Sequence, residues 1–231
     1  MKPTTFFITG TDTGVGKTVL TALLARYLRE RGVNAVALKP ICSGGRDDVR
    51  VLHAATGGIL SVDEINPWHF RAPVAPLLAA CKERRRINLA EVLAHIRGIQ
   101  KRFDILMIEG AGGLLSPLGE GFNSRDLIEA LRADPLVVCT NRLGVINQVL
   151  LTVEALSRES AAAARVVTMS PSKPDESTKS NAALLAEQCH GRKILHVPWL
   201  GRKFELKAGL RNLQVRKVLR ELASGLRMGA T

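Results

Sequence analysis

The sequence predicts an α/β protein in which a mostly parallel sheet is flanked by helices in three layers. Apolar runs of strand length alternate with amphipathic stretches of helix length along the chain. The run at residues 104–108 is apolar almost throughout, as expected of a strand that is covered on both faces. A glycine-rich turn joins the first apolar run directly to a good helix former. This order of elements implies right-handed crossovers between parallel strands.

The length and composition are those of one globular domain. The 231 residues suffice for a sizeable core, and no repeat, low-complexity block or linker divides them. We therefore expect a single domain over residues 1–231. No apolar run is long enough to span a bilayer, and the first residues lack the pattern of a signal peptide. We expect a cytoplasmic protein with no membrane partner.

The periodicity of apolar residues places the elements in order. The first strand is expected to end at the glycine-rich turn, and the first helix to include residues 19–25. The later strands are expected at residues 34–39, 104–108, 135–140, 164–169 and 193–197, and the later helices at residues 47–56, 88–102, from about 123, 145–158 and near 178–189.

The last 30 residues are expected to form one basic amphipathic helix. Apolar residues recur there at helical intervals, and arginine and lysine fill the gaps. The segment 202–231 is therefore predicted to pack as a helix on the body of the domain. The apolar positions are Leu206, Leu210, Leu213, Val218, Leu222 and Leu226.

The net charge of +12 raises the possibility of a nucleic-acid partner. Residues 202–231 contribute eight basic and two acidic side chains, which is +6 and half of the total. Aromatic residues make up only 4% of the chain and do not interleave with the basic clusters, so a platform for stacking bases is not expected. We interpret the excess as solvated basic faces and expect no nucleic-acid partner.

The glycine-rich turn, residues 10–18, has the composition of a phosphate-binding loop. A strand, glycines, a lysine, a hydroxyl residue and a helix follow one another in the order that such a loop needs. Lys17 is expected to reach the β- and γ-phosphates, and the Thr18 hydroxyl to ligate Mg²⁺. Five residues separate Gly10 from Gly16, one more than in the common pattern, so the loop is a variant.

Two other strand ends carry polar groups. Lys39 leaves the second strand, followed by Ser43, where a lysine could neutralise a reacting anion and a hydroxyl could bind substrate; a surface lysine is the plainer alternative. Glu109 ends the apolar strand and enters a second glycine-rich turn, a position suited to holding Mg²⁺. Asp48 precedes a helix, where carboxylates are also common as caps.

The four cysteines, Cys42, Cys81, Cys139 and Cys189, have no paired spacing, which argues against a zinc site or a disulfide framework. Cys42 has no histidine near it in sequence that could activate a thiolate. We do not expect it to be a nucleophile.

Taken together, these segments resemble the dethiobiotin synthetase family, whose fold is that of the phosphate-loop nucleotidases. Residues 10–18 are similar to its variant loop, Lys39-Pro40 with Ser43-Gly44 to its second motif, and residues 109–113 to its third. Residues 143–147 resemble a segment that contacts substrate across a dimer interface in that family, and residues 198–200 a late nucleotide-binding segment.

The resemblance implies an ATP- and Mg²⁺-dependent ligase that closes the ureido ring of dethiobiotin from 7,8-diaminopelargonic acid and carbon dioxide, as a homodimer. It implies catalytic roles for Lys17, Lys39 and Thr13, and a Mg²⁺ site at Thr18, Asp48 and Glu109. The diamine or its carbamate would meet Ser43, Gly112 and, from the partner subunit, Gly144, Val145, Ile146 and Asn147. The nucleotide would meet Gly14, Val15, Gly16, Lys17, Thr18, Val19, Asp48, Glu109, Gly110, Ala111, Gly112, Met169, Ser170, Pro198, Trp199, Leu200 and Glu205.

One position departs from the family pattern. Met169 stands where the family commonly has an asparagine that reads the adenine edge, and a thioether cannot make an amide's paired hydrogen bonds. We therefore expect relaxed base selectivity or weaker ATP binding.

Two rival functions share the phosphate loop. A ligase that amidates cobyrinate-like carboxylates would need a glutamine-amidotransferase partner or domain. A ParA- or MinD-like switch ATPase would typically carry another lysine early in the loop, and residues 10–15 contain none.

Overall fold

The computed structural model describes residues 3–189 and 191–224. Six parallel strands form the sheet in the order β2-β5-β1-β6-β7-β8, which confirms the predicted α/β class. The strands are β1 (Thr4–Gly10), β2 (Ala35–Leu38), β5 (Ile105–Glu109), β6 (Asp134–Thr140), β7 (Arg165–Met169) and β8 (Ile194–Val197).

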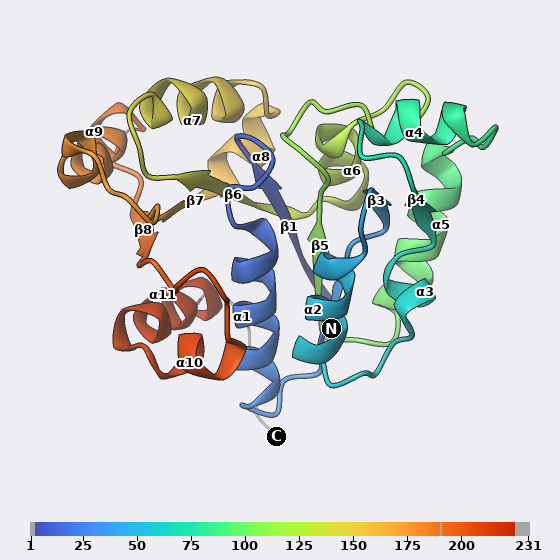
Figure 1. Cartoon of the computed structure of the whole chain (residues 1–231), viewed down its shortest axis with the longest axis horizontal. Helices are drawn as coiled ribbons and strands as arrows, with labels where there is room; N and C mark the ends of the chain where they lie inside the picture. The colour runs from blue at the N-terminus through green and yellow to red at the C-terminus, as the bar shows by residue number, and fades with distance from the viewer. Residues whose placement is uncertain (1–2, 190, 225–231) are drawn as a thin grey trace.

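Helices cover both faces of the sheet (Figure 1). Alternate residues of β1 supply the two cores: Phe7 points to one, and Phe6 and Ile8 point to the other. The first face is covered by α5 (Leu89–Gln100), α6 (Ser124–Leu131), α7 (Val145–Glu154), α8 (Arg158–Ala163) and α9 (Asn181–Gln188), and the second by α1 (Lys17–Arg29), α2 (Asp47–Ala55), α10 (Leu206–Arg211) and α11 (Leu213–Ala223).

The parallel arrangement gathers the carboxyl ends of the strands at one edge of the sheet. β1 ends at Gly10, β5 at Glu109 and β7 at Met169, so the loops that follow them lie along one edge. Ligands of open α/β sheets bind at such an edge.

Two of the predicted helices are wrong in extent. The stretch 145–158 is not one helix, because α7 ends at Glu154 and the Ser157 side chain caps a separate helix, α8. The helix expected near 178–189 consists of a 3₁₀ turn, η1 (Glu176–Lys179), followed by α9.

The single C-terminal helix is also wrong. α10 ends at Arg211, and Asn212 then takes an extended conformation, with its side chain accepting hydrogen bonds from the amides of Gln214 and Val215. An asparagine in this role starts a new helix. Leu226 and the rest of residues 225–231 lie outside the described residues.

Several short elements between α2 and α5 were not predicted from the sequence. They are β3 (Ile41–Ser43) and β4 (Trp68–Phe70), which form a separate parallel pair, and the helices α3 (Val62–Ile65) and α4 (Pro76–Lys82). Strands of three residues and a helix of four are too short to show a hydrophobic period.

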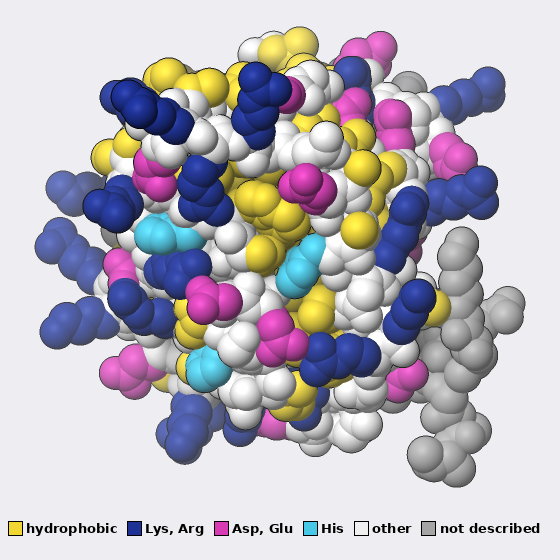
Figure 2. Space-filling model, turned by 90° about the vertical axis from the view of Figure 1, so that its right-hand side faces the viewer, with side chains coloured by type: hydrophobic (Ala, Val, Ile, Leu, Met, Phe, Trp, Pro, Cys, Tyr) yellow, Lys and Arg dark blue, Asp and Glu magenta, His cyan; other side chains and the backbone are white. Residues whose placement is uncertain are grey.

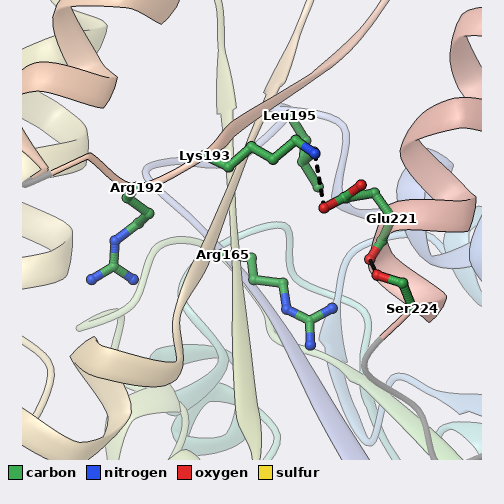
Figure 3. Close-up of a pocket in the computed structure, with 6 residues that line it drawn as sticks. All are labelled: Arg165, Arg192, Lys193, Leu195, Glu221 and Ser224. Carbon is green, nitrogen blue, oxygen red and sulfur yellow. Dashed lines mark hydrogen bonds and ion pairs between the residues drawn. The ribbon is translucent and has the colours of Figure 1, made fainter.

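Basic side chains at the other end of the sheet fix α11 in place (Figure 3). Lys193 Nζ lies 2.8 Å from Glu221 Oε1, and Arg165 Nη1 donates to the Leu222 carbonyl at 2.7 Å. Two of the cations beside this cavity of about 250 Å³ thus bind oxygens of α11, while Arg192 donates to the Ala164 carbonyl. Its lining residues are Arg165, Arg192, Lys193, Leu195, Glu221 and Ser224.

One face of the molecule agrees with solvated basic side chains. On the side shown in Figure 2, lysine and arginine side chains are interspersed with carboxylates. Within the described part of the chain, no helix combines the length and apolar character needed to cross a bilayer.

Candidate active site

The phosphate loop has the predicted context of strand, turn and helix. It leaves β1 at Gly10 and enters α1 at Lys17, and the Leu20 amide closes the first helical turn on the Gly16 carbonyl at 3.1 Å. Gly16 has φ +100°, and a Cβ there would lie 3.0 Å from Met169 Cγ. Glycine is therefore required both for the backbone conformation and for the contact with β7.

Lys17 lies buried at the start of α1. Its Nζ donates to the Asp12 carbonyl within the loop at 2.8 Å. Burial is the main reason that the pKa of Lys17 is lowered to about 8; the charge of Glu109 acts in the opposite direction, and nearby Lys39 acts with burial. A phosphate bound in the loop would supply the negative charge that favours the protonated form.

Lys39 lies between two carboxylates. Its Nζ is 2.7 Å from Glu109 Oε1, and it also pairs with Asp48 at the first turn of α2. Burial alone would lower the pKa of Lys39, but the charges of Glu109 and Asp48 outweigh burial and raise it. Burial would raise the pKa of Asp48, and Lys39 lowers it. The plain surface lysine considered for position 39 is thereby excluded.

The oxygens around Glu109 fit a magnesium ion. Glu109 Oε1 accepts from Thr18 Oγ1 at 2.7 Å, while Glu109 Oε2 is buried and has no hydrogen-bond partner among the described residues. No group of three or more His, Cys, Asp or Glu side chains in that part of the chain could hold a metal by itself. Carboxylate and hydroxyl oxygens completed by phosphate and water are the usual Mg²⁺ environment.

The second glycine-rich turn packs on the phosphate loop. A Cβ on Gly113 would lie 3.4 Å from the Thr11 carbonyl oxygen. A Cβ on Gly112, which has φ +71°, would lie 2.5 Å from Ser116 Oγ and 3.8 Å from Thr13 Oγ1. Thr13 and Gly112 therefore face the same space, whereas Gly110, two residues earlier in the turn and before Ala111, lies against Ser124 and Phe7.

Ser43 and Cys42 lie at the end of β3. Ser43 Oγ donates to the Val74 carbonyl at 2.6 Å, which leaves the oxygen lone pairs for a substrate N–H. Burial raises the pKa of the Cys42 thiol, in agreement with its exclusion as a nucleophile.

The residues predicted for the nucleoside lie farther along the same edge. Met169 is buried against Gly16 at the end of β7, and Ser170 follows it. Pro198, Trp199 and Leu200 follow the neighbouring strand β8, with the Trp199 side chain 47% exposed. Glu205 immediately precedes α10.

The segment from Gly144 to Asn147 is not joined to the lysine cluster. It forms the first turn of α7, and within the described residues no hydrogen bond links it to Lys17, Lys39 or Glu109. The structure of one chain therefore leaves its predicted substrate contact as a prediction.

Two clusters of hydrogen-bonded polar side chains near the carboxyl edge of the sheet were not predicted from the sequence. Asn181 Nδ2 donates to Asn141 Oδ1 at 2.8 Å, and Asn141 Nδ2 donates to the Thr178 carbonyl at 3.0 Å. In the other, His196 of β8 lies between Thr168 and Ser170 of β7. Their members are separated by up to 40 residues in sequence, and no local pattern reveals such contacts.

We expect Asn181→Ala to destabilise the chain by about 1–3 kcal/mol, because it leaves the buried Asn141 Oδ1 without this donor. Urea unfolding monitored by circular dichroism would measure this. Asn147→Ala, at an exposed position, is the control and should change the free energy of unfolding by less than about 0.5 kcal/mol. Equal effects of the two substitutions would contradict the assignment.

The sequence of this chain is similar to a family model and to several known proteins. A family model described as an AAA domain matches residues 4–202. An ATP-dependent dethiobiotin synthetase of Anaeromyxobacter dehalogenans (strain 2CP-C) is 40% identical over 198 residues, which cover 84% of this chain and 89% of the relative. The synthetase of Bacillus subtilis (strain 168) is 36% identical over 198 residues, covering 83% of this chain and 85% of the relative.

Solved structures agree on the fold alone. The hydrogenase maturation factor HypB of Archaeoglobus fulgidus superposes with a TM-score of 0.50 at 16% identity, over 94% of this chain and 91% of that one. Chloroplast FtsY of Physcomitrella patens gives a TM-score of 0.54 at 16% identity, over 93% of this chain and 65% of that one.

Proposed function

The chain belongs to the AAA-domain family and to the dethiobiotin synthetases within it, and from this membership we propose that it closes the ureido ring of dethiobiotin. The substrates are 7,8-diaminopelargonic acid, carbon dioxide and ATP. The site at the carboxyl edge of the sheet supports this reaction, because two lysines, two carboxylates and two glycine-rich turns converge there.

The reaction has three stages. One substrate amine takes up carbon dioxide as a carbamate, whose oxygen attacks the γ-phosphate of ATP to give a carbamic–phosphoric anhydride and ADP. The second amine then attacks the carbamoyl carbon, closes the ring and releases phosphate. Phosphoryl transfer of this kind depends mainly on positioning and on stabilising charge.

The chain's residues have separate tasks in this scheme. Lys17 and the amides of the phosphate loop bind the phosphates, and Lys39 balances the charge shared by carbamate and γ-phosphate. Thr13, Ser43 and the Gly112 backbone orient the diamine, so that attack occurs within one bound complex.

Mg²⁺ would be held by Thr18, Asp48 and Glu109, where it would neutralise charge on the β- and γ-phosphates. The observation in favour of this site is Glu109 Oε2, which has no hydrogen-bond partner among the residues that the structure describes. We place the reaction in the cytoplasm, where ATP is supplied.

The observation that carries the proposal is Lys39 held beside Glu109 at the mouth of a phosphate loop. A switch ATPase needs no such lysine for a second anionic reactant. The test is phosphate release by the purified chain with Mg²⁺, ATP and bicarbonate, with and without the diamine, and mass analysis of the product. Diamine-dependent release with formation of dethiobiotin is expected. Hydrolysis indifferent to the diamine would favour the switch.

We also propose that the active form is a homodimer formed through α7. Leu143, just before α7, is 80% exposed, and Leu151 on α7 is 62% exposed; the predicted substrate segment Gly144–Asn147 lies between them. Exposed apolar patches mark protein interfaces.

Leu151→Glu is expected to convert a dimer into monomers in sedimentation velocity and to lower turnover with it. Leu213→Glu is the matched control, because Leu213 is 81% exposed on α11, which covers the other face of the sheet. A wild-type chain that sediments as a monomer at micromolar concentration would contradict the proposed dimer.

A further inference from the structure

The path of the nucleotide across the edge follows from where the charged groups lie. The phosphates belong at the loop between Gly10 and Lys17, and the lysine and carboxylate cluster lies on the β2 and β5 side of that loop. The γ-phosphate therefore points toward β5. The nucleoside must extend the other way, over the ends of β7 and β8, where Met169 already touches Gly16.

At that end of the edge, His196 connects Thr168 and Ser170 through hydrogen bonds, and these three residues form the histidine relay. His196 Nδ1 is 2.9 Å from Thr168 Oγ1, and His196 Nε2 is 3.0 Å from Ser170 Oγ. Ser170 is further fixed because its amide donates to the Val197 carbonyl at 2.9 Å. Ser170 directly follows β7 at this edge of the sheet and is half-buried.

The direction of each hydrogen bond in the relay can be deduced. Thr168 is fully buried, and its hydroxyl donates to the Leu195 carbonyl at 3.2 Å, since a carbonyl can only accept. Its oxygen must then accept from His196 Nδ1–H. Burial lowers the pKa of His196, which favours the neutral ring, so Nε2 carries no proton and accepts from the Ser170 hydroxyl.

We propose that the Ser170 hydroxyl can only accept a hydrogen bond from the nucleotide base, because it donates its own proton to His196. Ser170 would therefore select bases with an exocyclic amino group over bases with a carbonyl at that position. An amino group donates to Ser170 Oγ, whereas a carbonyl would meet a lone pair. This inference rests on the proposed nucleotide-dependent function. It refines the relaxed selectivity expected of Met169, because ATP and CTP would be accepted and their keto counterparts disfavoured.

The test compares nucleotides in which a carbonyl, with a proton on the adjacent ring nitrogen, replaces this amino group. Dissociation constants of the Mg²⁺ complexes of ATP and inosine triphosphate, and of CTP and UTP, would be measured by calorimetry without the diamine. The full chain is expected to bind the amino member of each pair about fivefold more tightly, because one neutral hydrogen bond changes a dissociation constant by about that factor.

Two substitutions should act in opposite ways. Ser170→Ala removes the acceptor and should weaken the binding of ATP about fivefold, whereas the binding of inosine triphosphate should not weaken, because its carbonyl no longer meets a lone pair. His196→Ala leaves the Ser170 hydroxyl free to donate. This variant should therefore bind inosine triphosphate more tightly, relative to ATP, than the unaltered chain does. Ser172→Ala, at an exposed position in the same loop, is the control and should preserve the wild-type ratio. Melting curves establish that each variant is folded.

The outcomes separate the two proposals. Equal binding of ATP and inosine triphosphate by the unaltered chain, or an unchanged ratio in Ser170→Ala, overturns the selection by Ser170 and leaves the proposed function standing. Failure of every nucleotide to bind overturns both.

Discussion

Replacing Lys39 with methionine is expected to lower turnover by about 10²–10³-fold, the usual effect of removing one group that stabilises transition-state charge. It should also destabilise the chain by about 3–5 kcal/mol in the absence of Mg²⁺. The physical reason is that the Glu109 side chain is wholly buried and Lys39 is its only cationic partner among the described residues. Methionine preserves the length of the stem and removes the charge.

The two effects can be separated by adding the metal. Mg²⁺ should stabilise the Lys39→Met chain more than the unaltered chain in urea unfolding, because the metal would supply the positive charge that Glu109 and Asp48 have lost. Turnover should remain low. Lys207→Met, an exposed lysine of α10, is the control for loss of charge alone. Retained turnover in Lys39→Met would remove Lys39 from the reaction, and an equal response to Mg²⁺ would argue against the metal site.

The charged groups that the structure brings together share one property. Lys17, Lys39 and Glu109 each lie at the carboxyl end of an apolar strand or in the segment that follows it, and parallel strands bring their carboxyl ends together whatever the order of the sheet. The sequence could therefore predict that these groups meet. It could not predict that Lys39 lies between Glu109 and Asp48, because that contact depends on where α2 packs.

The features that were not predicted depend on contacts between distant residues or on local backbone conformation. Neither produces a periodic pattern of apolar residues in the sequence. His196 alternates with apolar residues in β8 and has no mark of function until β7 places Thr168 and Ser170 beside it. The break at Asn212 lies inside a run of helical apolar spacing, and a capping side chain there overrides the pattern. Leu206, Leu210, Val218 and Leu222 of α10 and α11 still pack in one core, which explains why one helix was predicted, whereas Leu213 at the break is exposed.

Gly16→Ala tests whether the contact between the phosphate loop and β7 matters for function. Alanine must adopt φ +100° and place its Cβ 3.0 Å from Met169 Cγ. We expect a loss of about 1–2 kcal/mol in stability from the backbone alone, and a fall in turnover of about 10²-fold because the loop amides shift from the phosphates.

Gly57→Ala is the matched control for that substitution, since Gly57 has φ +74° and no atom within 4 Å of the added Cβ. It should cost similar stability and leave turnover unchanged. Adding Met169→Ala to Gly16→Ala should restore part of the activity, because the smaller side chain gives the new methyl group room, and a double-mutant cycle measures that coupling. If Gly16→Ala behaved like Gly57→Ala in both assays, the loop would tolerate the shift, and Met169 would be only a core residue. A positive coupling would instead mean that β7 fixes the loop in the conformation that binds phosphate, and that the residue at position 169 acts on both ends of the nucleotide.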